Sequence, residues 1–399
     1  MDSETLIVAK SRGSRLIDKK GRSYVDYGMA MGANLVGHAH PVINEACIAA
    51  LEGGSMCGFR HDREEQAGEA LARVGGRLSK VTFVTTGTEA VHLACRIARG
   101  ATGRPLVCKT VGGYDGWLEE LRFGLVGSPE TERRNDRPVR DGMTLVRVND
   151  FDDLEQLFIE KGSELAAILI EPMLGNTACL VPERAWFEML NELADKHGIM
   201  IIADEVMVGL RLGVKLVSET LGLKPDLVTM GKAIGSGVPV AAVLGTPEAF
   251  KVVESNRVSR FGTYHGNPLV TAAVKATIEL LESSDYEAGL FQFGREVRRQ
   301  LPEIFAAEGI TVSTSGFDSV YSLWFAPEAP RTYDEALRLV QVETSRVVYE
   351  VLRRNGVVAL PSPWGRYFVS FAHDSTDLDI TLNAFRAAAR KTAEARSLS

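Results

Sequence analysis

Two short apolar runs that each end in a charged residue are the feature that most constrains this chain. The run Ile199–Ala203 is apolar and rich in isoleucine, and Asp204 and Glu205 follow it directly. A second run, Leu227–Met230, is followed by a glycine and then by Lys232. Such runs are typical of strands buried on both faces of a parallel sheet. The pattern predicts an α/β fold in which two strands deliver opposite charges to their carboxyl ends.

Asp204 and Lys232 are expected to share one site. An unpaired buried charge is unfavourable, and open α/β sheets bind ligands outside the carboxyl ends of their strands. A lysine forms a Schiff base with an aldehyde, and an aspartate beside a pyridine nitrogen keeps that nitrogen protonated. The two side chains together are the minimal protein contribution to binding pyridoxal 5'-phosphate (PLP). A structural salt bridge between the two strand ends is the alternative, which this pair alone does not decide.

The composition argues against several classes of partner. Of the 399 residues, 45% are hydrophobic and 24% charged, and the net charge of −7 favours neither nucleic acid nor an anionic membrane as partner. The N-terminal segment lacks the apolar core of a signal peptide, and no apolar stretch approaches the length of a membrane span. Five scattered cysteines without a C-x-x-C motif favour reduced thiols over a zinc site. We therefore expect a cytoplasmic protein without a metal ion.

A strand, a glycine turn and a helix predict an anion site. Val81–Thr85 is the expected strand, Gly87 and Thr88 lie in the turn, and the helix follows from Glu89. Backbone N–H groups and the positive end of the helix dipole at such a start favour phosphate. A capping box between Thr86 and Glu89 explains the same residues without a ligand. The segment lacks the Walker lysine and the three-glycine dinucleotide pattern, so it does not indicate ATP or NAD.

Two further loops follow expected strands. Tyr114 comes after the strand Leu106–Cys108, where an aromatic ring could stack on a flat cofactor or simply pack against the protein. Asn176 comes after the strand Leu165–Ile170. Strands and helices alternate from about residue 80 to residue 245, and an α+β segment follows them.

These motifs occur in the order that is found in the class III PLP-dependent aminotransferases of fold type I. The chain resembles that family from about Asp18 to about Ala389, most closely in the branch that contains glutamate-1-semialdehyde 2,1-aminomutase. The segments that carry the resemblance are VDY…LVGHAHP, TGTEA, GGYDGW, EPMLGN, DEVMVGLR, MGKAIGSGVPV, GTYHGNPL and FVSFAHDSTDLD. The resemblance implies a mainly parallel central sheet in a large PLP-binding domain, residues 42–285. Residues 1–41 and 286–399 would together form a smaller α+β domain.

The resemblance also implies a set of cofactor contacts. Lys232 would be the Schiff-base lysine and general acid/base, and Asp204 would contact the pyridine nitrogen. The other contacts implied are Gly87 and Thr88 at the phosphate, Tyr114 stacked on the ring, Asn176 near the ring hydroxyl, Val206 under the ring face, and Thr263 at the phosphate of the neighbouring subunit. The last of these implies a homodimer with shared active sites.

Three departures from the family pattern bear on the substrate. Lys10 aligns with an arginine that holds the substrate carboxylate in the aminomutase, and Gly365 aligns with a glutamate of its C-terminal segment. Arg366 falls where many class III aminotransferases carry the arginine that binds the α-carboxylate of the amino donor, although it could also be a surface residue. A guanidinium suits a bidentate carboxylate contact better than an ammonium does. Asp115 stands where the family usually has histidine.

The sequence therefore predicts a PLP-dependent aminotransferase. It would move an amino group from an amino acid donor to an aldehyde or ketone of a small biosynthetic metabolite, such as a sugar or a cyclitol. An intramolecular aminomutase of the glutamate-1-semialdehyde type is the main alternative. A non-catalytic binding protein of the same fold is a third, and the intact Lys232 and Asp204 count against it.

Overall fold

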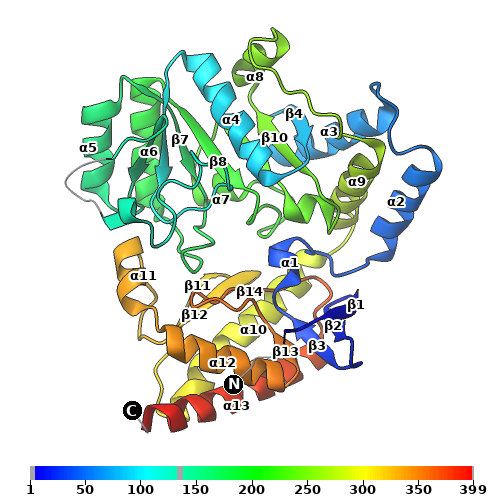
Figure 1. The fold of residues 1–399 in the computed structure, drawn as a ribbon, viewed down its shortest axis with the longest axis vertical. Coiled ribbons are helices and arrows are strands. Elements are labelled where there is room, and N and C mark those ends of the chain that lie inside the picture. The colour runs from blue at the N-terminus through cyan, green and yellow to red at the C-terminus, as the bar shows by residue number, and fades with distance from the viewer. Residues whose placement is uncertain (1–4, 133–137, 398–399) are drawn as a thin grey trace.

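The computed structural model describes residues 5–132 and 138–397, and its upper part in Figure 1 is built on a seven-stranded sheet. The strand order is β4-β10-β9-β8-β7-β5-β6, and only β10 runs antiparallel to its neighbours in these described residues. The strands are β4 (Lys80–Val84), β5 (Leu106–Thr110), β6 (Met143–Val146), β7 (Leu165–Ile170), β8 (Met200–Glu205), β9 (Leu227–Met230) and β10 (Ala241–Gly245). The predicted mainly parallel sheet of fold type I is confirmed.

Helices cover both faces of this sheet, which explains why its strands read as continuous apolar runs. In β8, Ile201 and Ala203 face one core layer and Ile202 faces the other. Successive side chains of a strand point to opposite faces, so both must be apolar where helices pack on both sides. The helices of this part are α2 (Pro41–Glu52), α3 (Asp62–Gly75), α4 (Gly87–Thr102), α5 (Phe151–Lys161), α6 (Arg184–His197), α7 (Val217–Leu221), α8 (Pro247–Glu254) and α9 (Pro268–Glu282).

Both ends of the chain lie together in the lower part of Figure 1. There β13 (Val357–Val358) joins the N-terminal strands β1 (Val8–Arg12), β2 (Arg15–Asp18) and β3 (Ser23–Asp26) in one sheet, and β11 (Ser313–Phe317), β12 (Val320–Trp324) and β14 (Tyr367–Phe368) form another. The remaining helices are α1 (Met29–Gly32), α10 (Tyr286–Ala306), α11 (Tyr333–Leu339), α12 (Val342–Arg354) and α13 (Ser375–Ser397). The domain limits 1–41, 42–285 and 286–399 stay a prediction.

Polar contacts fasten the two chain ends to each other. The Ser14 hydroxyl donates to the Asp377 carboxylate at 2.6 Å, and the Tyr27 hydroxyl donates to Thr381 at 3.0 Å. Asp377 also pairs with Arg15 at 2.6 Å. Segments at opposite ends of the sequence therefore form one buried polar cluster, which lies apart from the large sheet.

Particular residues set two of the helix ends. The cap of α3 is His61, because its ring accepts the Glu64 N–H at 3.1 Å and its other nitrogen contacts the Gly266 carbonyl. A break at Val340, whose backbone is extended, separates α11 from α12. No helix in the described part of the chain is long and apolar enough to cross a membrane.

Candidate active site

Five strands that run in one direction end at the same edge of the large sheet, and the predicted site residues follow them. β4 leads into α4, β5 into the turn that carries Tyr114, and β7 into Glu171. β8 ends in Asp204 and Glu205, and β9 is followed by a 3₁₀ turn that begins at Lys232. The fold therefore brings segments that are far apart in sequence to the edge where α/β sheets bind ligands.

Asp204 is a buried carboxylate that its neighbours hold in one orientation. It is 5% exposed, and it pairs in register with Thr229 of β9. The Thr229 hydroxyl donates to Oδ1 at 2.8 Å, and the Val206 N–H donates to the same oxygen at 2.9 Å. Oδ2 accepts no hydrogen bond from the described residues, so it is available to a ligand.

Lys232 lies at the end of the neighbouring strand in a backbone conformation with φ of 47°. Burial lowers the pKa of its ammonium below the usual range, while the negative charges of Asp204 and Glu171 act in the opposite direction. Lys232 forms neither a hydrogen bond nor an ion pair with the residues that the structure describes. The salt bridge considered as the structural alternative is therefore not formed, and the lysine is a partly buried amine without a partner among the described residues.

Asp204 and Glu171 have no paired cation among the described residues. Burial, and next the charge of Asp115, raise the pKa of Asp204 to about 7. Burial, followed by the charges of Asp115 and Asp204, raises the pKa of Glu171 to about 8. A protonated ring nitrogen at Asp204 would supply a cation where one is missing. The donor set of this site therefore fits PLP.

The start of α4 lies against Val206. A Cβ atom on Gly87 would come within 2.7 Å of Val206 Cγ1, so only glycine allows this approach. The capping box between Thr86 and Glu89 is present. It does not use the N–H groups of Gly87 and Thr88, which lack an intrahelical acceptor because they lie in the first turn. The capping box and a phosphate site are thus compatible.

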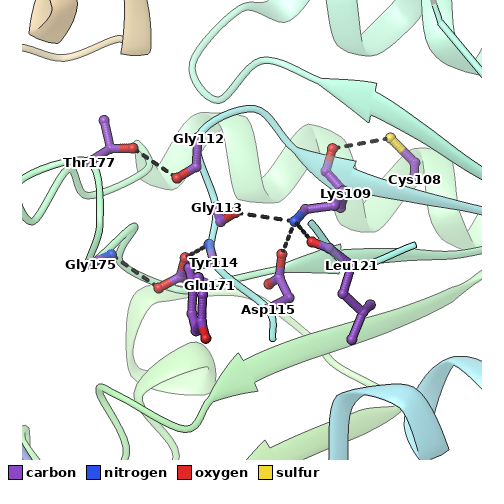
Figure 2. A network of polar contacts seen from close by, with 10 residues as sticks. All are labelled: Cys108, Lys109, Gly112, Gly113, Tyr114, Asp115, Leu121, Glu171, Gly175 and Thr177. Carbon is purple, nitrogen blue, oxygen red and sulfur yellow. Dashed lines mark hydrogen bonds and ion pairs between the residues drawn. The ribbon is translucent and has the colours of Figure 1, made fainter. Parts of the chain in front are cut away.

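A single carboxylate connects the loops that carry Tyr114 and Asn176. Glu171 Oε1 accepts the Tyr114 N–H at 2.8 Å, and Oε2 accepts the Gly175 N–H at 3.1 Å (Figure 2). Glu171 is 4% exposed, so these bonds lie inside the protein. The structure thereby brings the two predicted ring contacts next to each other.

The two candidate substrate residues lie in different surroundings. Arg366 is half-buried and donates from Nη1 to the Asn176 side-chain oxygen, while its Nε is buried without a hydrogen-bond partner among the described residues. Lys10 is exposed on the strand β1 and forms no described contact with Lys232, Asp204 or Arg366. Arg366 therefore contacts the loop that carries Asn176, and Lys10 lies on the surface.

Thr263 lies on an exposed loop and not beside Lys232. The loop borders a cavity of about 1290 Å³ whose other lining residues come from 56–72 and 79–83. Two large aromatic side chains next to Thr263 are exposed: Phe261 at 91% and Tyr264 at 65%. His265 of the same loop approaches Glu89 of its own chain at 3.6 Å, near the start of α4. The loop is therefore close to the predicted phosphate site and also open to a partner.

Sequence reasoning missed several residues that shape the site. Thr229 stands out in the sequence only as a hydroxyl within an apolar strand, which was a signal that it contacts a polar group. Glu171 marks the end of β7 in the sequence, but nothing there identifies its partners. Of the two carboxylates that end β8, Glu205 has a structural role, because it accepts the Val217 and Ser218 N–H groups at 2.9 and 2.8 Å and so holds α7.

No group of three His, Cys, Asp or Glu residues suited to a metal ion occurs within 5–132 and 138–397. A partly buried lysine, a carboxylate without a paired cation and a helix start with free N–H groups are instead what a PLP-dependent enzyme requires. In agreement, residues 1–316 match the family model of the class-III aminotransferases. The chain belongs to this family, and it is accordingly a PLP-dependent enzyme.

The relatives and similar solved structures include both aminomutases and a transaminase. A glutamate-1-semialdehyde 2,1-aminomutase of Thermus thermophilus is 36% identical over 390 residues, which cover 96% of this chain and 91% of the relative. The same enzyme of Nitratidesulfovibrio vulgaris is 35% identical over 394 residues, covering 97% and 92%. The solved structure of an omega-transaminase from Sphaerobacter thermophilus is similar with a TM-score of 0.88 at 27% identity, covering 98% of this chain and 92% of that one.

Proposed function

We propose that this chain is an aminotransferase that takes an amino group from an amino acid donor and transfers it to an aldehyde or ketone of a small metabolite. The observation that carries the proposal is Arg366. Its guanidinium contacts Asn176, and its buried Nε has no partner in the described part of the chain. A cation held by a neutral amide can still bind an anion, and the α-carboxylate of a donor fits this requirement.

The residues of the site divide the chemistry among them. Bound PLP would supply a carbonyl group for covalent attachment and a ring that withdraws electrons from the substrate carbon. Burial lowers the pKa of the Lys232 amine, which favours the neutral form, so Nζ would accept the proton of the substrate carbon and return it. Asp204 Oδ2 would hold the proton of the ring nitrogen.

The remaining contacts bind and enclose the cofactor. The N–H groups of Gly87 and Thr88 would bind the phosphate at the positive end of α4. Tyr114 and Val206 would cover the two faces of the ring and exclude water from it, and Asn176 would lie near the ring hydroxyl. Each of these residues stands at the same sheet edge as Lys232 or on a loop that begins there.

An intramolecular aminomutase is the second candidate, and the names of the relatives favour it. Both reactions use the same proton transfers at Lys232 and differ in whether the first product leaves the site. The aminomutase requires a cation near the N-terminus for its substrate carboxylate. Lys10, the candidate for that role, is exposed on β1, which supports the aminotransferase.

Arg366→Ala tests the donor site. Without its cation, a donor carboxylate would face an uncompensated pocket, so donor kcat/KM should fall by about 30- to 1000-fold, or roughly 2–4 kcal/mol. The acceptor half-reaction, started from the aminated cofactor, should change much less if the acceptor lacks a carboxylate. Donors are compared by the rate at which glutamate, glutamine or alanine bleaches the yellow absorbance band.

Lys10→Ala is the matched control, because it removes the other candidate cation from an exposed position. It should leave donor kinetics unchanged if the aminotransferase proposal is right. Equal small losses in both half-reactions for Arg366→Ala would make that residue a surface arginine. Conversion of glutamate 1-semialdehyde that depends on Lys10 would establish the aminomutase.

We further propose a cytoplasmic homodimer in which Thr263 completes the phosphate site of the neighbouring subunit. The exposed aromatic side chains beside Thr263 support a subunit contact there, since large apolar side chains are enriched where proteins associate. Nucleic acid and membranes are not expected as partners, because the net charge is −7.

A mixed dimer tests the sharing of sites. One chain carries Lys232→Ala, the other carries Thr263→Val, and differently tagged chains are purified together. If sites are shared, one site of the mixed dimer has both residues intact and regains the PLP affinity of the unaltered enzyme. The Thr263→Val homodimer should bind PLP about 10-fold more weakly, as expected for one lost hydrogen bond to a charged group. Affinity equal to that homodimer would mean that each chain binds PLP alone.

A further inference from the structure

A second buried lysine organises the turn that carries Tyr114. Lys109, at the end of β5, is 0% exposed, and its ammonium donates to the carbonyl oxygens of Gly113 at 3.1 Å and Leu121 at 2.6 Å. Its third contact is the Asp115 carboxylate at 2.8 Å (Figure 2). Two hydrogen bonds and one ion pair therefore tie this cation to the turn.

Two of these three contacts flank Tyr114 directly. The carbonyl before Tyr114 and the carboxylate after it both bind the Lys109 ammonium, and the N–H of Tyr114 itself donates to Glu171. The Tyr114 side chain is 42% exposed and has no hydrogen bond to the described residues. The backbone of Tyr114 is therefore fixed from three directions while its ring stays open to a ligand.

The same network connects this turn to the loop of Asn176. Glu171 binds the backbone on both sides, and the Thr177 hydroxyl donates to the Gly112 carbonyl at 3.1 Å. A Cβ atom on Gly112 would come within 2.6 Å of Thr177 and Tyr333, so the two loops are in close contact. Movement of the Tyr114 turn would thus disturb the position of Asn176 as well.

Asp115 is the acidic member of this network, and it is almost completely buried at 1% exposure. It forms an ion pair with Lys109 through Oδ2, and neither carboxylate oxygen has a hydrogen-bond partner among the described residues. A buried ion pair can be removed as a unit with little loss, but removal of one partner leaves an uncompensated charge. The position of the Tyr114 turn therefore depends on the charge of Asp115.

We propose that Asp115, paired with Lys109, is a positioning residue that holds Tyr114 against the face of the cofactor ring. It acts through Tyr114 and touches neither substrate nor cofactor. The inference rests on the proposed cofactor site, since it requires Tyr114 to contact the ring.

Asp115→Asn tests this role, because it keeps the size of the side chain and removes the charge. PLP affinity is measured by titrating the apoenzyme and following protein fluorescence, which does not depend on turnover. The variant should bind PLP about 10-fold more weakly, the size expected when one charge-assisted contact is lost. The Asp115→Asn variant should also shift the pH at which the yellow absorbance band of the bound cofactor changes in intensity, because the surroundings of the cofactor change.

A double-mutant cycle with Tyr114→Ala shows whether Asp115 acts through Tyr114. Once the ring is gone, Asp115→Asn should cause little further loss of PLP affinity. Full additivity of the two losses would overturn the inference. The inference would also be overturned if Asp115→Asn lowered only the melting temperature and left PLP affinity and the absorbance spectrum unchanged. If Tyr114→Ala alone leaves the affinity unchanged, the proposed stacking role fails first.

Two further variants keep the test decisive. If Asp115→Asn does not fold, Lys109→Met combined with Asp115→Asn removes both charges and carries the same cycle. Arg15→Met is the matched control, because it breaks the Arg15–Asp377 ion pair in the other part of the molecule. It should lower the melting temperature without changing PLP affinity.

Discussion

Lys109 and Lys232 lie at the same edge of the same sheet, the first fully and the second partly buried, yet their surroundings are opposite. The ammonium of Lys109 has three acceptors, two carbonyl oxygens and the Asp115 carboxylate. Lys232 has no partner among the described residues, and burial lowers the pKa of its amine. Both lysines follow apolar strand residues, so the strand pattern does not distinguish them.

The difference shows which surroundings make a lysine reactive and which give it a structural role. A lysine whose ammonium is paired with acceptors and a carboxylate stays protonated. It holds its neighbours in place and has no lone pair for attack on a carbonyl carbon. A buried lysine without a partner loses its proton more readily, and the free amine is the form that attacks a carbonyl carbon. The same comparison applies to the acids, because Asp115 is paired with a cation and Asp204 is not.

Replacement of Lys232 should have the largest effect. Lys232→Ala removes both the attachment point and the general acid/base, so each half-reaction should slow by at least about 1000-fold. Borohydride reduction of the unaltered enzyme should fix the cofactor to Lys232 alone, as peptide mapping would show. Lys224→Ala and Lys251→Ala, at lysines outside the site, should react like the unaltered enzyme. A reduced adduct on either of those residues would disprove the assignment.

Replacement of Asp204 should have the next largest effect. Asp204→Ala removes the acceptor for the ring-nitrogen proton, a contact of about 1.5–3 kcal/mol, so half-reactions should slow by roughly 10- to 150-fold. PLP should remain bound but more weakly. The control is Asp226→Ala, since Asp226 accepts the Ile201 N–H at the opposite end of β8. Unchanged half-reaction rates in Asp204→Ala would contradict the role of that residue.

The strands of the sheet could be predicted because burial on both faces leaves a clear pattern. The limits of Leu165–Ile170 and Leu227–Met230 agree with the structure. The antiparallel direction of β10 was not predictable, since an apolar run reads the same in either direction. The predicted strand Leu106–Cys108 is too short, because β5 continues through Lys109 to Thr110. Acceptors that come from the following turn allow this lysine to be buried.

The site could be predicted only where one residue type carries the chemistry. Asp204 and Lys232 were found because a strand end seldom carries a charge without a partner or a ligand. Neither Glu171 nor Thr229 could be assigned, because their roles depend on which strands are neighbours. Thr229 lies opposite Asp204 only through the pairing of β8 with β9. Register between strands is a property of the folded sheet and leaves little trace in either strand alone.

The titration of Lys232 should distinguish it from other lysines. In the apoenzyme, burial lowers the pKa of Lys232, so its amine should become reactive toward a small acylating reagent at lower pH than the amine of a free lysine does. The midpoint of labelling against pH, read by mass spectrometry, reports this pKa independently of how accessible the residue is. Asp204→Asn should move the Lys232 midpoint lower still, because the negative charge of Asp204 raises it. A midpoint equal to that of free lysine would contradict the comparison.

The smallest expected effect concerns the stability of the apoenzyme. The folded-state pKa of Asp204, about 7, lies above its usual value of 3.8, so the folded state binds the proton more tightly than the unfolded chain. The stabilisation that results is complete at low pH and is lost as the pH rises through about 7. Asp204→Asn lacks this titration. Relative to the unaltered apoenzyme, the variant should therefore gain stability between pH 5 and pH 8, by on the order of 1–3 kcal/mol in denaturant unfolding.

Asp115→Asn is the matched comparison, because it neutralises a carboxylate at the same sheet edge that already has its cation. At pH 8 it leaves Lys109 buried without a counter-charge, so it should destabilise the apoenzyme while Asp204→Asn stabilises it. Addition of PLP should reverse the sign for Asp204 only, since the cofactor would supply the cation that this carboxylate lacks. Destabilisation by both variants at pH 8 would mean that both carboxylates are compensated within the protein, and stabilisation by both would mean that neither is. Either result would contradict the distinction between the two sites.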